Sequence, residues 1–359
     1  MATLTEVSVM ARKTIKWGLV ALVIMALIPG IMALMRRVYL TLNPPPPPPP
    51  TVKYGKLPKL IFPEAPNFAT PEYKLETITG ALPAMPNVSK VYPVGINKSR
   101  LLILERMTEK ARSVGLSNEP IQLDERTYRF SSPKLPIDMI FDVITGGLSY
   151  KFDWTTDRSN YFVQDVPIGN EAIVGAKRFL ERLGVLDEDI ANGTSRIIYL
   201  SATSSAMLPE TSPYEANFTR VDLYRAEKNE ELPTGEKLTM KIVTVGGETS
   251  PVNVIVSGLS GDKQIVQANY YYSQTLGDDF ATYPLKPVSE AWKELVDGGG
   301  FIAKRTTENQ VTVRRVSLAY FESNEQQAFL QPVYVFEGDA GFTAYVQAVG
   351  TQFTSDEAR

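Results

Sequence analysis

The sequence of 359 residues contains no cysteine and no histidine. Without cysteine, the chain can form no disulfide, thiolate nucleophile or cysteine-ligated metal site. Without histidine, it can carry out neither Ser-His-Asp nor Cys-His catalysis, and it can hold no histidine-ligated zinc or haem. Imidazole cannot serve as a pH switch either. We therefore expect no catalytic residues, no cofactor and no metal site.

Net charge is also small, at −3, but it is unevenly distributed. The first 43 residues carry one acidic residue, Glu6, against the basic residues Arg12, Lys13, Lys16, Arg36 and Arg37. Beyond them lie 32 basic and 39 acidic residues, a net charge of −7. A mildly acidic domain is a poor electrostatic partner for nucleic acid, so we expect no nucleic-acid partner.

One long apolar run, residues 17–35, carries no charge. At 1.5 Å per residue it spans about 28 Å, close to the thickness of a hydrocarbon core. Trp17 lies at one end, where interfacial aromatic residues are common, and Pro29-Gly30 inside the run is expected to kink the helix. The run predicts a transmembrane helix over residues 15–37. A cleaved signal peptide or a buried core helix is the alternative.

This helix predicts a single-pass protein of the cell membrane, with the lipid bilayer as a partner of residues 17–35. We expect residues 1–14 to be cytoplasmic and the large C-terminal domain to be extracytoplasmic. Both flanks of the run are basic, so the positive-inside rule scarcely discriminates between the two orientations. Absence of cysteine is common in bacterial extracytoplasmic proteins and is compatible with an extracytoplasmic C-terminal domain.

A heptaproline run, residues 44–50, follows. It predicts a polyproline II stalk of roughly 20 Å; a PxxP ligand for a recognition domain is the alternative. Residues 51–93 contain many more prolines and few periodic runs, which indicates extended chain lying over a neighbouring subunit or domain.

From residue 94 onward, an amphipathic helix followed by strands recurs three times. Apolar residues at helical spacing predict helices over 101–114, 172–183 and 288–295. The first ends at Gly115, the second at Gly184 and the third at Gly298-Gly299-Gly300. Strands are predicted at 127–130, 148–154, 196–202, 217–226, 238–245, 252–257, 264–272, 301–305, 311–321, 329–336 and 342–349.

Short loops between successive strands favour antiparallel meanders, each covered by its helix. The predicted fold class is therefore α+β, with the transmembrane helix followed by two or three such units. Their predicted limits are 94–166, 167–283 and 284–351, with a tail at 352–359.

The last of these units contains AWKELVDGGGFIAK (291–304), VTVRRVSLAYFES (311–323), FLQPVYVFEG (329–338) and FTAYVQAV (342–349). These stretches resemble the C-terminal part of the YycH/YycI regulatory proteins, which belong with PepSY domains in a wider family. Residues 168–227 resemble the preceding half more faintly. The heptaproline and the segment up to residue 93 do not belong to the pattern.

The resemblance implies a non-enzymatic cell-envelope protein with an extracytoplasmic domain. In that family the anchor helix associates with other membrane proteins, including a sensor kinase that it restrains. The resemblance supplies no catalytic residues to transfer, and nothing in the present anchor identifies a kinase.

Several short motifs resemble catalytic or ligand-binding sites, but a structural role is favoured for each. Ser131–Lys134 and Ser260–Lys263 have the Ser-x-x-Lys spacing of a Ser-Lys nucleophile, but both lie in predicted loops. Asp187, Asp189 and Asn192-Gly193 suggest a calcium loop without the required spacing. The glycines 298–300 lack the Lys-Ser/Thr of a phosphate loop. A carboxylate-pair glycosidase needs no histidine, but the sequence singles out no pair.

Tyr270-Tyr271-Tyr272 places aromatic neighbours on both faces of a predicted strand. At least one ring is then exposed unless the sheet is covered twice, and an exposed ring can anchor a partner; packing against a helix or repeat is the alternative. With Trp17, Pro29 and Gly30 of the apolar run, these tyrosines are the interaction candidates.

These patterns together predict a non-catalytic, membrane-anchored interaction, regulatory or assembly protein of the cell envelope. Its partners are expected to be other membrane or envelope proteins, or further copies of itself in a homo-oligomer. A ligand-binding or adhesion module is the first alternative. A carboxylate- or Ser-Lys-dependent cell-wall hydrolase is the second.

Overall fold

A computed structural model describes the chain apart from residues 1–3, 43–47, 64–70, 96–99, 163–164, 205, 247–249, 273, 277–278, 324–326 and 356–359. The chain divides into two compact units, and each is described by itself. The first consists of residues 1–49 and 233–235, and the second of residues 50–232 and 236–359.

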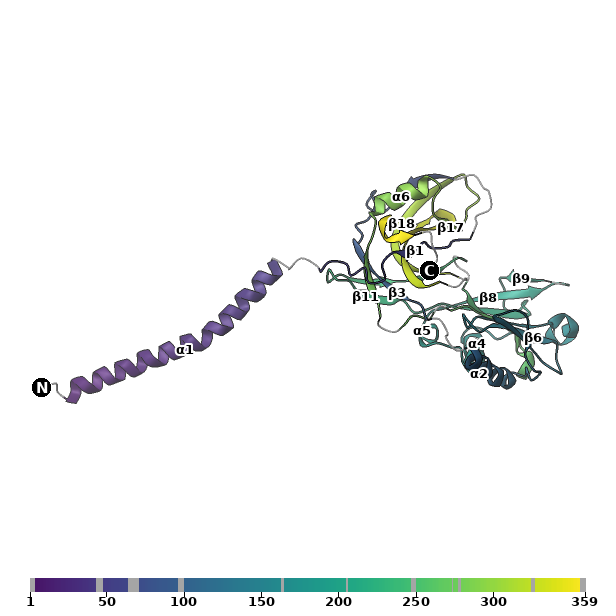
Figure 1. The fold of residues 1–359 in the computed structure, drawn as a ribbon, viewed down its shortest axis with the longest axis horizontal. Coiled ribbons are helices and arrows are strands. Elements are labelled where there is room, and N and C mark those ends of the chain that lie inside the picture. The colour runs from purple at the N-terminus through teal and green to yellow at the C-terminus, as the bar shows by residue number, and fades with distance from the viewer. Residues whose placement is uncertain are drawn as a thin grey trace. The chain divides into compact units, whose positions relative to one another are not determined.

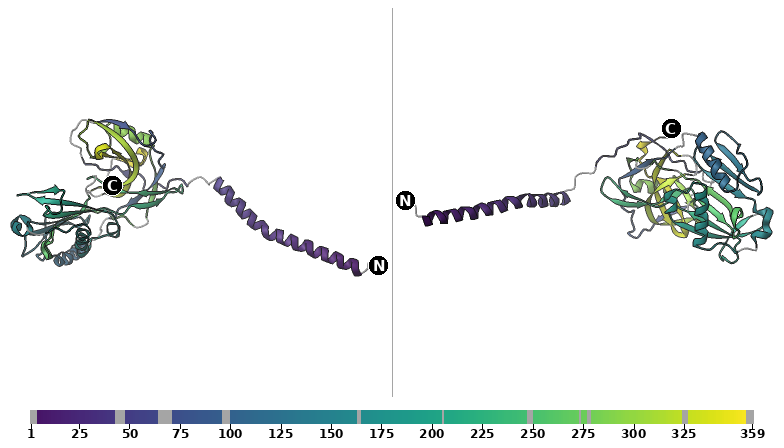
Figure 2. Two further views of the ribbon diagram at one scale, coloured as in Figure 1. Left: turned by 180° about the vertical axis from the view of Figure 1, so that it is seen from behind. Right: turned by 90° about the horizontal axis from the view of Figure 1, so that it is seen from below.

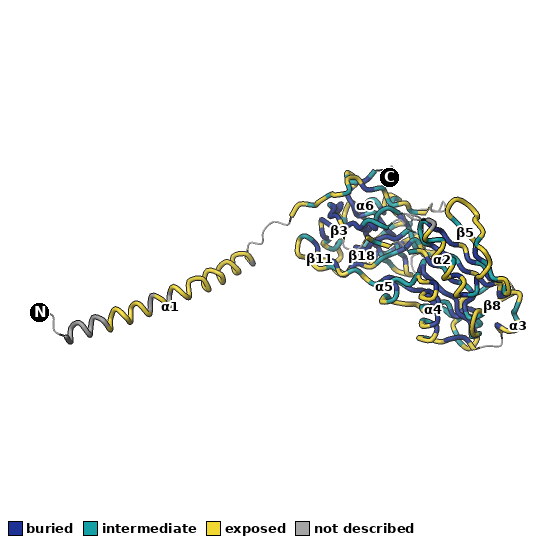
Figure 3. The backbone as a smooth tube through the Cα atoms, turned by 60° about the horizontal axis from the view of Figure 1, so that its bottom comes forward, coloured by how far each residue is buried: buried dark blue, intermediate teal, exposed yellow. Residues whose placement is uncertain are grey.

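The first unit is dominated by one helix, α1 (Leu4–Leu42), whose described side chains are exposed along its length (Figure 3). Within its described residues, no helix of the chain combines the length and the apolarity that crossing a membrane requires.

The transmembrane prediction over residues 15–37 is therefore wrong. The predicted single-pass localisation, with a cytoplasmic N-terminus and an extracytoplasmic large domain, is wrong for the same reason. The predicted contact of residues 17–35 with a lipid bilayer stays a prediction.

The interaction candidates of the apolar run lie on α1. Trp17 is 68% exposed, Pro29 lies inside the continuous helix, and nothing contacts an ideal Cβ at Gly30 within 4 Å. Most of the predicted proline stalk, residues 44–47 of 44–50, lies outside the described residues.

The second unit contains the three predicted amphipathic helices. They are α2 (Arg100–Ser113), α4 (Asn170–Arg182) and α6 (Val288–Val296), which confirms the periodicity argument. Gly184 follows α4 with φ +67°, and Val185 N–H donates to the Leu180 carbonyl, which is the expected glycine stop. Short helical turns are α3 (Arg158–Tyr161), α5 (Glu188–Ala191), η1 (Trp154–Asp157), η2 (Gly261–Lys263), η3 (Asp339–Gly341) and η4 (Thr351–Phe353).

Nine strands drawn from the first two predicted units form one sheet. In the described residues it has nine strands in the order β4-β5-β6-β7-β15-β14-β10-β8-β9, all paired antiparallel. Their bounds are β4 (Ile121–Gln122), β5 (Thr127–Ser131), β6 (Ile137–Asp142), β7 (Leu148–Phe152), β8 (Ser195–Ala202), β9 (Met207–Glu210), β10 (Phe218–Leu223), β14 (Val252–Val256) and β15 (Ile265–Tyr270). In every view of this unit, α2 and α4 lie together on one side of the sheet (Figures 1 and 2).

The remaining strands form an eight-stranded sheet and two small ribbons. The sheet runs β13-β18-β19-β20-β17, with β2 on β18 and with β3 pairing both β19 and β16. Its strands are β2 (Glu72–Leu75), β3 (Val88–Pro93), β13 (Ile242–Thr244), β16 (Ala281–Pro284), β17 (Phe301–Lys304), β18 (Gln310–Glu322), β19 (Phe329–Gly338) and β20 (Thr343–Gln347). The ribbons pair β1 (Leu57–Pro58) with β21 (Thr354–Ser355), and β11 (Lys228–Glu231) with β12 (Lys237–Met240).

The predicted fold class of separate α+β meander units is therefore wrong. The chain is mostly β, with 36% strand and 26% helix in several large sheets. β7 of the first predicted unit pairs with β15 of the second, so these two units share one sheet. Residues 51–93, predicted to lie over a neighbour, supply β1, β2 and β3 to the chain's own C-terminal sheets.

Candidate functional site

A single row of side chains crosses the nine-stranded sheet from β4 to β8. Directly paired residues of antiparallel strands project from the same face, and the register joins eight of them. This polar row consists of Ile121, Arg129, Ile140, Ser149, Asn269, Asn253, Asp222 and Arg196.

The polar row lies on the face turned away from α4. Tyr150, Ala268 and Val254 alternate with its members, and they belong to the buried core that includes Phe179 of α4. The Tyr150 and Phe179 rings are 4.9 Å apart in an edge-to-face arrangement. We call the face that carries the polar row the open face.

The central part of the polar row is hydrogen-bonded from strand to strand. Ser149 Oγ donates to Asn269 Oδ1 at 2.9 Å, and Asn269 Nδ2 donates to Asn253 Oδ1 at 3.2 Å. Asn253 Nδ2 in turn donates to the Ser250 carbonyl at 3.0 Å. These bonds satisfy buried amides and set the side-chain orientations along the row.

Asp222 ends this network with an unsatisfied oxygen. Its side chain is 1% exposed; Oδ1 accepts from Arg220 Nε at 2.8 Å, whereas buried Oδ2 has no partner among the described residues. Burial raises the pKa of Asp222 above its ordinary value, although the positive charges of Arg220 and Arg196 oppose this effect.

This raised pKa predicts a pH-dependent stability. An acid whose pKa is higher in the folded state contributes stability that is present below its unfolded value of 3.8 and is lost as pH rises through the folded value. We expect the free energy of unfolding of the wild type, relative to that of Asp222→Asn, to fall as pH rises from the unfolded pKa to the folded pKa and then to level off. Chemical denaturation at a series of pH values measures this difference.

Asp138→Asn is the matched control, because Asp138 lies on the same face but is 45% exposed and paired with Arg129. It is expected to leave the pH profile of the wild type in place. A stability difference between the wild type and Asp222→Asn that does not change with pH would contradict the burial argument.

One end of the open face exposes apolar side chains. Leu123, Ile121 and Ile140 are 50%, 57% and 45% exposed, and Tyr271 is 39% exposed. The Tyr271 ring lies against Gly147 at the start of β7, where an ideal Cβ would be 3.1 Å from Tyr271 Cδ1. We call these four side chains the contact patch. Exposed Lys151 of β7 lies on the same face.

The tyrosine triplet therefore divides between two faces. Tyr270 is buried and its hydroxyl donates to Asp187 Oδ2 at 2.8 Å, while half-buried Tyr272 lies 5.8 Å from it, ring to ring. Tyr271 alone belongs to the contact patch. The sequence pattern thus pointed to an exposed ring without showing which one.

A second polar cluster joins the two large sheets around Arg225, which follows β10. Its Nη1 donates to Glu322 of β18 at 2.8 Å and its Nε to Asp189 of α5 at 2.7 Å. The guanidinium carbon lies 4.4 Å from the centre of the Tyr272 ring. Burial disfavours the charge, yet Glu322 and Asp189 together keep the pKa of Arg225 above its ordinary value.

Glu230 of β11 is the centre of a neighbouring buried cluster. It accepts from Tyr92 Oη at 2.6 Å and Tyr320 Oη at 3.2 Å, and it pairs with Lys90 Nζ at 2.9 Å. Three strands that are distant in sequence, β3, β11 and β18, meet at this carboxylate. We read both clusters as joints between sheets, since the charged groups of each bind residues from separate strands and helices.

The chemical motifs weighed from the sequence lie in structural settings. Ser131 Oγ accepts from Asn118 Nδ2 at 2.9 Å, and Lys263 pairs with Asp157 at 2.5 Å. Asp187 and Asp189 bind Tyr270 and Arg225 as described above, so they do not form a solvated loop. Among the described residues, no group of three acidic side chains is placed to hold a metal ion.

No protein-family model matches the chain, and no curated protein matches it. A 1.45 Å crystal structure of an uncharacterized protein from Eubacterium rectale ATCC 33656 is similar over 76% of this chain and 86% of that chain. The TM-score is 0.38 and the sequence identity is 10%, which supports no inference about fold or function.

Proposed function

We propose that the protein is a non-catalytic interaction module that binds a partner protein through the contact patch. The observation that carries this proposal is the exposure of Ile121, Leu123, Ile140 and Tyr271 on the sheet face turned away from α4. The resemblance of residues 291–349 to the YycH/YycI proteins, which act through protein contacts, points to the same class.

The chemistry of the patch indicates what kind of surface it binds. Tyrosine and branched aliphatic side chains supply the apolar centre of protein interfaces, and tyrosine is enriched among residues that dominate affinity. Lys151 has no ion-pair partner among the described residues, so the partner is expected to present a carboxylate beside its apolar contacts. The polar row supplies hydrogen-bonding groups at the rim.

Replacing Tyr271 tests the patch directly. We expect Tyr271→Ala to weaken partner binding by about 2 kcal/mol, roughly 30-fold, because a central interface tyrosine is removed. Lys151→Glu is also expected to weaken binding. The loss of affinity is expected to be larger at low salt than at high salt, because salt screens an exposed charge pair. Tyr214→Ala is the matched control, because Tyr214 is 90% exposed and lies outside the open face.

The partner is first identified by placing a photo-crosslinking amino acid at position 140 or, as control, at position 214 in cells that make the protein. The affinity of the purified partner is then measured for the wild type and the three variants. The proposal is contradicted if positions 140 and 214 capture the same proteins, or if Tyr271→Ala and Tyr214→Ala weaken binding equally. Capture of a second copy at position 140 would identify the partner as the protein itself.

A further inference from the structure

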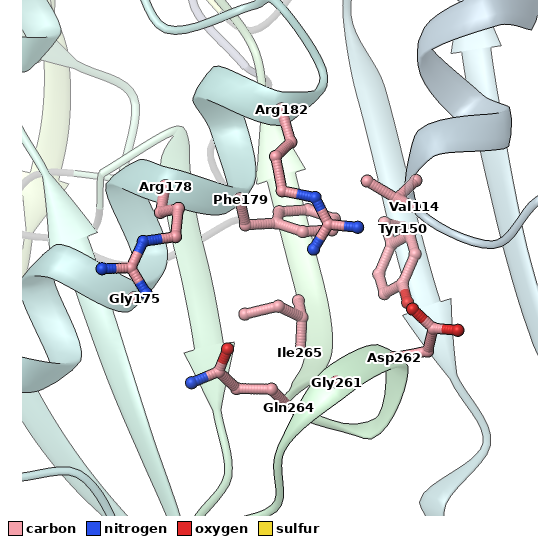
Figure 4. Close-up of a pocket in the computed structure, with 10 residues that line it drawn as sticks. All are labelled: Val114, Tyr150, Gly175, Arg178, Phe179, Arg182, Gly261, Asp262, Gln264 and Ile265. Carbon is pink, nitrogen blue, oxygen red and sulfur yellow. The ribbon is translucent and has the colours of Figure 1, made fainter.

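A small cavity lies between the second half of α4 and the loop that leads into β15 (Figure 4). It is shallow and open to solvent, and the side chains of Arg178, Arg182 and Asp262 at its edge are exposed. Apolar walls come from Val114, Phe179 and Ile265, and polar groups from Arg178, Arg182 and Gln264. Apolar walls with a few convergent polar groups are typical of small-molecule sites.

Gly175 keeps this cavity open. It lies inside α4, where glycine is the least favourable residue other than proline. An ideal Cβ at this position would lie 3.8 Å from Gln264 Nε2 and 3.8 Å from Val256 Cγ1, an ordinary contact distance. An alanine therefore fits without a clash and occupies part of the space.

The polar groups around the cavity favour a carboxylate. Arg178 and Arg182 are one turn apart on the same helix face; Arg182 also donates to the Ser113 carbonyl, whereas Arg178 has no partner among the described residues. A guanidinium binds a carboxylate through two parallel hydrogen bonds. Figure 4 shows Arg178 and Gln264 on one side of the cavity, opposite Tyr150 and Asp262.

The opposite side of the cavity restricts the charge of a ligand. Burial and the nearby Asp262 raise the pKa of Tyr150, so its hydroxyl remains a hydrogen-bond donor at neutral pH. The Asp262 carboxylate repels a second negative charge and accepts hydrogen bonds. A monoanion that carries an N–H donor or an apolar group next to its carboxylate matches these walls better than a dianion such as phosphate.

We propose that this cavity binds a free carboxylate, from a small organic acid or from the C terminus of a peptide. The carboxylate lies between Arg178 and Gln264, and the adjoining group packs against Phe179 and Ile265. A C-terminal peptide also places its last amide N–H toward Asp262. This site does not depend on the contact patch, so either proposal can fail without the other.

The test is a ligand-observed NMR titration of the full chain with propionate, N-acetyl-Ala-Ala and N-acetyl-Ala-Ala-amide, with inorganic phosphate as competitor. Both free carboxylates are expected to bind at least tenfold more tightly than the amide, and phosphate is expected not to displace them. A tenfold preference for the dipeptide over propionate identifies a peptide C terminus, and equal binding identifies a small acid. Equal binding of the amide, or displacement by phosphate, overturns the proposal.

Three variants locate the binding. Arg178→Gln is expected to weaken binding of the free carboxylates at least tenfold, and Arg106→Gln, which removes the same charge from the exposed surface of α2, is expected to change it less than twofold. Gly175→Ala is expected to weaken binding at least fivefold while leaving the melting temperature unchanged or raised. Undiminished binding in either Arg178→Gln or Gly175→Ala places the ligand elsewhere and overturns the proposal.

Discussion

A chain truncated to residues 94–359 is expected not to fold, whereas one that begins at residue 50 folds cooperatively. The shorter chain lacks β3, which pairs with both β16 and β19 and buries Val91 completely in the core of the eight-stranded sheet. It also lacks β2, which pairs with β18, and Leu57, which is 0% exposed. Each buried apolar side chain removed costs about 2–5 kcal/mol, and the loss of Leu57, Val88, Val91 and Tyr92 together is comparable to a typical stability of about 5–15 kcal/mol.

Circular dichroism and thermal unfolding of the two chains check this result. A chain beginning at residue 71 is the informative intermediate, because it loses β1 and Leu57 but keeps β2 and β3. It is expected to fold with reduced stability. Cooperative unfolding of residues 94–359 at the temperature of the longer chain would show that residues 51–93 lie over the sheet without supporting it, as the prolines alone suggested.

Arg225→Met is expected to destabilise the protein by about 3–5 kcal/mol. The guanidinium is 4% exposed and its partner Glu322 is 2% exposed, so removing the arginine leaves a carboxylate buried beside β18 without its countercharge. The lost contact with the Tyr272 ring adds to this cost. Urea unfolding gives the free energy of unfolding for each variant.

A double-mutant cycle separates the cost of an orphaned charge from the worth of the ion pair. Arg225→Met combined with Glu322→Met is expected to recover most of the stability that Arg225→Met loses, because the deeply buried carboxylate is removed and Asp189, the other partner of Arg225, is 29% exposed. Arg129→Met is the surface control: Arg129 is 47% exposed and pairs with Asp138, which is 45% exposed, so about 0–1 kcal/mol is expected. If Arg225→Met lost as little stability as the surface control, the result would show that water reaches the cluster around Arg225.

The three amphipathic helices were predictable because each carries its own local information. In α4, apolar residues recur at helical spacing, and Gly184 adopts the positive φ that ends the helix. Most strands after residue 94 were also predictable from β-branched and aromatic runs. β6 was missed although it contributes Ile137, Met139 and Phe141 to the core in strict alternation.

The pairing of the strands was not predictable from local pattern. β7 and β15 are separated by more than 100 residues and yet lie side by side, because pairing depends on which edges remain free after collapse. The prolines of residues 51–93 indicated extended chain, but extended chain pairs with a sheet of its own molecule as readily as with that of a neighbour. β3 is such a case, with Pro93 at its end.

Some residues of the candidate sites were predictable from the sequence, and others were not. An exposed ring among Tyr270, Tyr271 and Tyr272 was predictable, because three adjacent tyrosines cannot all face one side of a strand; the structure shows that it is Tyr271. The burial of Asp222 and Arg225 was not predictable, because charged residues near a strand end are usually solvated. Both are buried only because of how their strand pairs with its neighbours. The signal available for Gly175 was its place inside a strongly amphipathic helix, where a glycine has a cost that packing or function must offset.

The long separation between β3 and its partners has a consequence during protein synthesis. Residues 88–93 leave the ribosome well before residues 281–284 exist, and at about 5–20 residues per second the delay is roughly 10–40 s. Through that interval the nascent strand presents unpaired backbone and the apolar Val91 and Tyr92. We therefore expect the nascent chain to need a chaperone that covers this strand, because the C-terminal sheet can close only as translation ends.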